Sequence, residues 1–336
     1  MTDTRPVSTA FLPLLAVLAV FFGASFPFAR LGVGAGASPF ALVVIDLGIA
    51  AGVMAVISAL SRAPWPRLRA LLTSTGVGAL LIGGINLPLF WGVQYATGGA
   101  AAIVYATAPL VSVLAALAFG SQIGLSGRQS LALGLGLLGV IVLVLTTAGS
   151  DVLTNFWAVV GFGIGAVCQG TGAVLLSRIK PEGEGRWGLT FQFLGAGALA
   201  TCVLLVLSPR VTVPWSPAVV ESIVFVALGS LVTGYVIFYE LVHRAGPVRA
   251  NFVTYLNPIV ALVIGVAAFH EPFQPFELAG LAIILVALGL MQRSERRPSR
   301  VPEGRASEAG ASPSSGHQPV TDPPVIPAPA RRRAHP

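Results

Sequence analysis

Residues 130–150 read SLALGLGLLGVIVLVLTTAGS and contain no charged side chain. A helix of this length is long enough to cross the hydrocarbon core of a bilayer. The rest of the chain has the same character: 55% of its 336 residues are hydrophobic and 10% are charged, whereas a soluble domain carries about 25% charged residues. A soluble fold needs a charged shell around its core, so the composition excludes one. The sequence therefore predicts an all-α integral membrane protein.

Apolar runs of similar length recur along the chain and predict ten transmembrane helices. The first run also resembles a signal peptide, but the many spans that follow it favour a first transmembrane helix. Tryptophans near the predicted interfaces fit an aromatic belt. They are Trp65, Trp157, Trp187 and Trp215. The expected spans are 7–29, 39–60, 70–93, 98–119, 129–148, 156–178, 188–208, 218–242, 248–269 and 274–292.

Basic residues predict the orientation, because Arg and Lys next to a span stay on the cytoplasmic side. With ten spans, residues 1–6 lie in the cytoplasm, and only Arg30 and Arg210 among the loop cations fall outside. Residues 293–336 are rich in Pro, Ser and Arg and predict a disordered cytoplasmic tail. The net charge of +7 is spread over short loops and this tail, so no nucleic-acid partner is expected. We expect a multi-pass protein of the bacterial inner membrane with both termini cytoplasmic.

No cofactor, metal site or disulfide is predicted. Cys168 and Cys202 both lie within apolar runs and lack the spacing of a zinc or redox motif. Gly134, Gly136 and Gly139 match the letter of a dinucleotide fingerprint, but small residues in an apolar helix serve close packing instead. A phosphate-binding loop is absent from the sequence, so ATP hydrolysis by this chain is not supported.

Two segments of the chain resemble each other. Pro109 is followed thirteen residues later by Gln122, and Pro258 is followed thirteen residues later by Glu271. An offset of 149 residues separates the two prolines, and an apolar, glycine-containing run follows each segment. The spacing predicts two five-helix repeats, 7–148 and 156–292. Because five is odd, the second repeat is expected to insert upside down relative to the first, as in carriers that alternate between two open states.

The motifs of the second repeat resemble those of EamA-type members of the drug/metabolite transporter superfamily. They are Tyr255-Leu256-Asn257-Pro258, then Phe269-His270-Glu271-Pro272, then Gly280 and Gly289. The first repeat keeps Pro109 and Gly139 but has Ser121-Gln122 in place of the usual acidic turn. The resemblance covers residues 10–292. It implies a gradient-driven carrier, probable in the direction of export, for amino-acid-like or other small organic solutes.

Two acidic residues are candidates for coupling transport to an ion gradient. Asp46 lies inside the second span, where charge is costly and usually faces a cavity. Either it carries a proton or cation, or it pairs with Arg30. Glu240 either titrates during transport or is an interfacial carboxylate beside His243 and Arg244. Glu271 is expected to fix the outer turn between the last two spans.

Polar and aromatic residues at membrane depth are candidates for the lining of a substrate cavity, and helix–helix hydrogen bonding is the alternative for each. Pro109 and Pro258 remove backbone hydrogen bonds and are expected to kink the fourth and ninth spans. The expected partners are a small-molecule substrate and the lipid bilayer, with a homodimer left open. The cavity candidates are Asn86, Trp91, Gln94, Tyr95, Tyr105, Gln169, Tyr235, Tyr239, Tyr255 and Asn257.

An integral membrane enzyme acting on lipid or prenyl substrates is the main alternative. Such chemistry needs clustered acids, a Ser-His or Cys-His pair, or an HExxH site, and the sequence shows none of these. A passive channel is expected to show a continuous polar stripe along one helix, whereas the polar groups here are scattered. A transporter is therefore favoured, and no enzymatic activity is expected.

Overall fold

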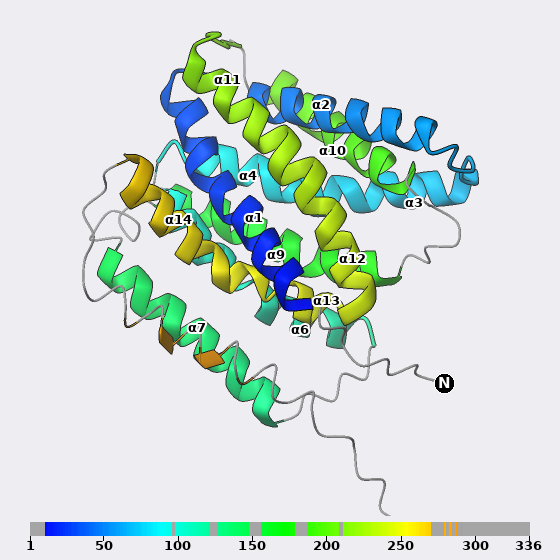
Figure 1. Ribbon diagram of the computed structural model, residues 1–336. Coiled ribbons are helices and arrows are strands. Elements are labelled where there is room, and N and C mark those ends of the chain that lie inside the picture. Colours follow the sequence, from blue (N-terminus) through cyan, green and yellow to red (C-terminus); the bar gives the residue numbers. More distant parts are fainter. Residues whose placement is uncertain are drawn as a thin grey trace, which may run out of the picture. The chain divides into compact units, whose positions relative to one another are not determined.

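The computed structural model describes residues 11–95, 98–120, 127–147, 156–178, 187–207 and 211–269, with six positions between 279 and 290. These residues belong to one compact unit, residues 1–297. The described elements are all helices (Figure 1). They are α1 (Phe11–Gly34), α2 (Pro39–Leu60), α3 (Leu68–Gly78), η1 (Ala79–Gly83), α4 (Gly84–Gly92), α5 (Gly98–Tyr105), α6 (Ala108–Ala118), α7 (Gly127–Thr147), α9 (Phe156–Arg178), α10 (Trp187–Leu207), α11 (Pro217–Val224), η3 (Phe225–Gly234), α12 (Tyr235–Ala245), α13 (Pro247–Ala250) and α14 (Val253–Phe269).

Each expected span up to residue 269 corresponds to one helix or to a run of consecutive helices. The end of the first span was predicted too early. The helix continues through Arg30 to Gly34, because a long basic side chain at a helix end reaches the polar interface. The tenth span, residues 1–6 and the tail fall mostly or wholly outside the described residues, as does Glu271.

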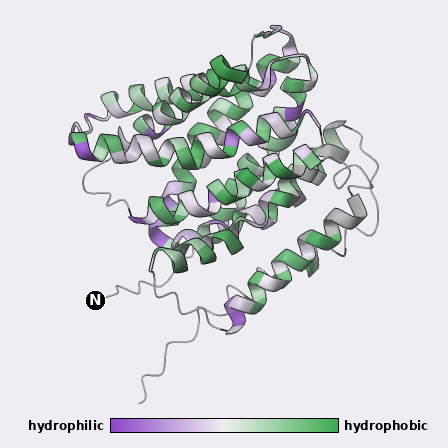
Figure 2. Cartoon of the chain, turned by 180° about the vertical axis from the view of Figure 1, so that it is seen from behind, coloured by the Kyte–Doolittle hydropathy of each residue, from purple (hydrophilic) through white to green (hydrophobic). Residues whose placement is uncertain are grey.

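Six of the described helical runs are long and apolar enough to cross a membrane. Large hydrophobic side chains such as Val56, Leu72, Leu205 and Val206 are more than half exposed. Figure 2 shows the apolar colouring continuing over the outward faces of the helices. An apolar exterior of this kind is the surface that lipid contacts.

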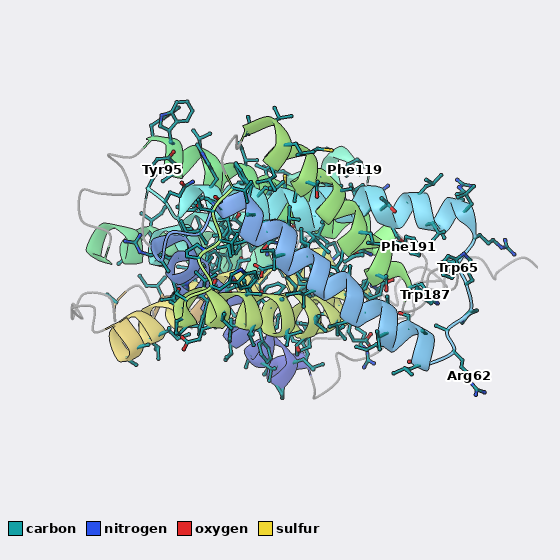
Figure 3. All side chains as sticks on the ribbon, turned by 90° about the horizontal axis from the view of Figure 1, so that it is seen from above. Arg62, Trp65, Tyr95, Phe119, Trp187 and Phe191 are labelled. Carbon is teal, nitrogen blue, oxygen red and sulfur yellow. The ribbon has the colours of Figure 1, made fainter. Side chains whose placement is uncertain are left out.

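Aromatic side chains gather at one end of α2 and α10. The ring of Trp65 lies 4.9 Å from that of Trp187 and 5.8 Å from that of Phe191, and Trp187 donates a hydrogen bond to the carbonyl of Ala63 at 3.1 Å. Figure 3 shows these three rings together near Arg62. Rings with a polar handle beside a cation fit the expected interfacial belt.

Two spans contain π-helical turns. The third span changes from α3 to η1 and then to α4, and the eighth changes from α11 to η3 and then to α12. An offset of 149 residues, the one that separates the two prolines, carries Ala79–Gly83 onto 228–232, inside η3. π-Helical turns occur often at functional sites, and both of these lie directly before residues of the cavity described below.

Glycine contacts between helices repeat with the same offset. A Cβ built on Gly23 of α1 comes 2.6 Å from Cβ of Val260 and 3.0 Å from the carbonyl oxygen of Asn257. A Cβ built on Gly170 of α9 comes 2.7 Å from Cβ of Val111 and 2.8 Å from the carbonyl oxygen of Ala108. Val111 and Ala108 precede Val260 and Asn257 by 149 residues. Each half therefore supplies a helix that packs on the other half in the same way.

Candidate functional site

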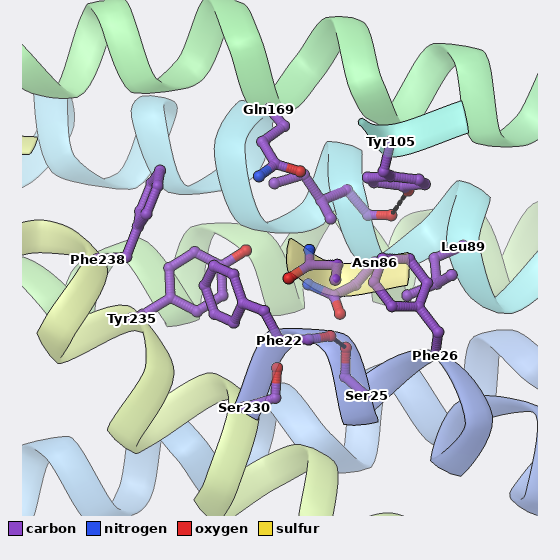
Figure 4. Close-up of a pocket in the computed structure, with 12 residues that line it drawn as sticks. Phe22, Ser25, Phe26, Asn86, Leu89, Tyr105, Gln169, Ser230, Tyr235 and Phe238 are labelled. Atoms are coloured by element: carbon purple, nitrogen blue, oxygen red, sulfur yellow. Dashed lines mark hydrogen bonds between the residues drawn. The ribbon is translucent and has the colours of Figure 1, made fainter. Parts of the chain in front are cut away.

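A narrow cavity lies between the helices that these glycines bring together (Figure 4). Three spans of the first half and three of the second contribute to its wall. Its volume of about 30 Å³ holds about two waters, so a larger solute requires the surrounding helices to separate. The lining residues are Phe22, Ser25, Phe26, Ile85, Asn86, Leu89, Tyr105, Gln169, Ser230, Tyr235, Phe238 and Asn257.

Aromatic rings form one side of this cavity. Phe22 of α1 lies 5.3 Å from the ring of Tyr235 and 5.7 Å from that of Phe238. Phe26 lies edge-on to Tyr105 at 5.4 Å. The contact between α1 and α12 is close because Gly234 leaves room for the ring of Phe22. The rings present an apolar and polarisable surface to whatever enters.

Polar groups occupy the rest of the wall, and several are held by backbone carbonyls. The hydroxyl of Tyr105 donates to the carbonyl of Ile85 at 2.7 Å, and that of Ser25 donates to Phe22 at 2.6 Å. The amide nitrogen of Asn86 donates to Ile82 at 2.8 Å. Figure 4 shows Asn86 lying between Tyr235 and Tyr105. These bonds fix the orientation of the side chains without a bound solute.

Gln169 is fixed by a buried chain of hydrogen bonds behind the cavity. Its amide nitrogen donates to Oδ1 of Asn251 at 3.3 Å, and Nδ2 of Asn251 donates to Oγ of Ser112 at 2.7 Å. Oγ of Ser112 lies 3.0 Å from the carbonyl oxygen of Ala108 and 3.2 Å from that of Gly170. All three side chains are at most 4% exposed. This relay joins the fourth, sixth and ninth spans at one wall of the cavity.

Five of the predicted cavity residues meet here: Asn86, Tyr105, Gln169, Tyr235 and Asn257. They come from five different spans, and two of the wall positions are related by the repeat. Asn86 corresponds to Tyr235 and Leu89 to Phe238 at the offset of 149 residues. The third and eighth spans therefore face the cavity with equivalent positions, each just after its π-helical turn.

The other five predicted cavity residues lie elsewhere. Trp91, Gln94 and Tyr95 gather at the end of α4, where Trp91 contacts the rings of Tyr95 at 5.4 Å and Trp157 at 6.1 Å and Gln94 donates to the carbonyl of Trp91. Tyr239 stacks on His243. Tyr255 donates to the carbonyl of Leu133 in α7 at 3.2 Å. Helix packing and interface contacts, the alternative that we considered for each of them, account for these positions.

Seven lining residues were missed by sequence reasoning, and most of them are apolar. Phe22, Phe26, Ile85, Leu89 and Phe238 resemble lipid-facing residues because their helices are hydrophobic on every side. Ser25 and Ser230 are small hydroxyl residues of a kind common in membrane helices. Their correspondence across the repeat was the signal available for Leu89 and Phe238.

Asp46 lies away from the cavity and is 1% exposed. Neither of its carboxylate oxygens has a hydrogen-bond partner among the described residues, so the pairing with Arg30 that we considered is not found. A charged carboxylate without a partner costs several kcal/mol in a dry environment. Asp46 is therefore a place where a proton or a cation has a large effect on the energy of the protein.

Glu240 and the two prolines have plain structural settings. Glu240 pairs with Arg244 one helical turn later, and both side chains are exposed. Pro109 begins α6 after an interruption at Ala106–Thr107. Pro258 lies inside α14, whereas the ninth span is interrupted earlier, between α13 and α14.

Comparison with known proteins matches the chain to one family and one fold. The model of the EamA-like transporter family matches twice, over residues 10–145 and 156–293. One crystal structure shares the fold, with a TM-score of 0.65 over 87% of this chain and 100% of the other at 17% identity.

Curated relatives match over most of their length. The inner membrane transporter YedA of Escherichia coli K12, named as uncharacterized, is 26% identical over 83% of this chain and 90% of its own. A probable terminal-alkyne amino-acid exporter of Streptantibioticus cattleyicolor is 27% identical over 87% of this chain and 97% of its own. With its two matched repeats and its apolar, membrane-length helices, the chain belongs to the EamA-like transporter family.

Proposed function

We propose that this protein is a secondary carrier of the bacterial inner membrane that exports a small organic solute by alternating access. The cavity carries the proposal, because three spans of each repeat meet around it and its polar groups lie at membrane depth. The names of the relatives in Escherichia coli and Streptantibioticus support a transporter of the inner membrane and an amino-acid-like solute.

Inverted insertion of the two repeats supports alternating access. Two repeats of five spans place equivalent helices in opposite directions, so opening on one side has an equivalent on the other. The matching contacts of Gly23 and Gly170 and the matching π-helical turns favour such a pairing. In this scheme the cavity opens to each side in turn, and the narrow volume belongs to a state between the two.

Asp46 is the candidate for coupling to the ion gradient. Its buried carboxylate lacks a hydrogen-bond partner, so binding and release of a proton change the energy of the second span strongly. α2 packs along α10, as shown by the 3.5 Å contact between the hydroxyls of Ser58 and Thr190. A change at Asp46 therefore acts on an interface between the two repeats.

Flux into proteoliposomes tests the proposal, with and without a pH gradient. The solutes are taken from a metabolite comparison of cells with and without the gene. Saturable flux that follows the gradient is the expected result. Flux that does not saturate indicates a channel, conversion of the solute indicates a membrane enzyme, and either result rejects the carrier.

A further inference from the structure

We propose that the cavity selects small amines and amides with an apolar or aromatic body and rejects carboxylates and phosphates. This inference rests on the proposed function, because it names the solute class for the same cavity. It narrows an amino-acid-like solute to one whose carboxyl group is absent or converted to an amide.

The first argument is charge. The lining residues include no Arg, Lys, His, Asp or Glu in the part of the chain that the structure describes. An anion that enters such a wall loses its hydration without gaining a cation. The interrupted fourth span gives no substitute, because the amides of Leu110 and Val111 at the start of α6 already donate to the carbonyl of Thr107.

The second argument is the direction of the hydrogen bonds. The hydroxyls of Ser25 and Tyr105 and the amide nitrogen of Asn86 donate to backbone carbonyls. The donors among these side chains are thus largely occupied, whereas the amide oxygen of Asn86 is directed away from its bonded nitrogen. A solute that needs to receive hydrogen bonds therefore finds few partners, and one that donates them finds several.

The relay behind Gln169 fixes a second amide in the same sense. The hydroxyl of Ser112 lies against two carbonyls, which only accept, so its proton goes to one of them and its oxygen accepts from Asn251. Asn251 consequently presents Oδ1 to the nitrogen of Gln169. The oxygen of Gln169 is left as the acceptor for the cavity that this residue lines.

Asn257 supplies the third acceptor. The residue is 2% exposed and lines the cavity, and its Oδ1 has no hydrogen-bond partner among the described residues. A buried amide oxygen without a donor costs free energy, and an entering N–H group removes that cost. The rings of Phe22, Phe26 and Phe238 add an apolar surface that also attracts ammonium groups.

Binding of three probes that share one phenylethyl body tests the inference: phenethylamine, 3-phenylpropanamide and 3-phenylpropionate. The full-length protein is held in lipid nanodiscs, and binding is measured by calorimetry. The amine and the amide are expected to bind at least about tenfold more tightly than the carboxylate, because only the carboxylate buries an uncompensated negative charge. Equal or tighter binding of the carboxylate, or binding of none of the three, overturns the inference.

Variants locate the selectivity. Gln169→Leu and Asn257→Leu are each expected to weaken amide binding several-fold. Gln192→Leu is the matched control, because Gln192 is also a buried amide without a partner but does not line the cavity. Equal losses in all three variants overturn the inference.

The flux assay separates this inference from the proposed function. Gradient-driven flux of a carboxylate through the cavity leaves the carrier standing and rejects the selectivity. The expected binding order without any gradient-driven flux has the opposite meaning.

Discussion

The contact between Gly165 and Tyr105 gives a sharp test of how the cavity is held. The hydroxyl of Tyr105 lies against Gly165 of α9, so a Cβ at residue 165 overlaps it. Tyr105 is 1% exposed and is enclosed by the rings of Phe26 and Phe162. The side chain therefore has no free space into which to retreat except the cavity itself.

Gly165→Ala is expected to destabilise the protein by about 2–4 kcal/mol. Overpacking of a filled core costs about 1–3 kcal/mol, and displacement of the Tyr105 hydroxyl from the carbonyl of Ile85 adds about 0.5–1.5 kcal/mol. Gly163→Ala is the matched control in the same helix, because nothing lies within 4 Å of a Cβ built there. The control is expected to be neutral, or more stable by up to about 1 kcal/mol through helix propensity.

Unfolding by SDS in mixed micelles measures the free energy of unfolding of both variants, and calorimetry measures phenethylamine binding to them. Gly165→Ala is expected to lose both stability and affinity, since the displaced ring enters the cavity. If the two variants are equally stable and bind the amine equally well, the described packing of Tyr105 against α9 is wrong.

Three further changes follow from the same contacts. Asp46→Asn removes the buried carboxylate and is expected to abolish gradient-driven accumulation in proteoliposomes while leaving exchange of solute intact; accumulation that is unchanged across pH removes Asp46 from coupling. Ser112→Ala leaves Nδ2 of Asn251 without its acceptor and is expected to cost about 1–3 kcal/mol of unfolding free energy, whereas a loss below about 0.5 kcal/mol contradicts the relay. Glu240→Gln breaks an exposed pair with Arg244 and is expected to change stability by less than about 1 kcal/mol, with transport unchanged; loss of gradient-driven flux makes Glu240 part of the mechanism.

The spans could be predicted from the sequence because apolar run length is set by the thickness of the bilayer. α2 and α9 begin and end at the predicted residues. The interruption at Ala106–Thr107 and the π-helical turns could not be predicted, since they depend on contacts between helices. α6 begins next to Pro109, but the ninth span is interrupted before α14, well ahead of Pro258.

The cavity could be predicted only in part. Amides and tyrosines at membrane depth are conspicuous in an apolar sequence, and Asn86, Tyr105, Gln169, Tyr235 and Asn257 were found in this way. Phe22, Phe26 and Phe238 are as hydrophobic as the lipid-facing residues around them, so only packing shows that they face inward. Sequence also does not distinguish an amide held by a relay, such as Gln169, from one such as Gln192, whose side chain has no described partner.

Access to the cavity from the two sides of the membrane tests the carrier most directly. Ser230→Cys places a thiol in the cavity wall, in a background where Cys168 and Cys202, the two cysteines of the chain, are replaced by Ala. Membrane-impermeant thiol reagents are applied to right-side-out and to inside-out vesicles. Alternating access predicts labelling from both sides, slowed in both cases by phenethylamine, whereas labelling from one side alone contradicts it.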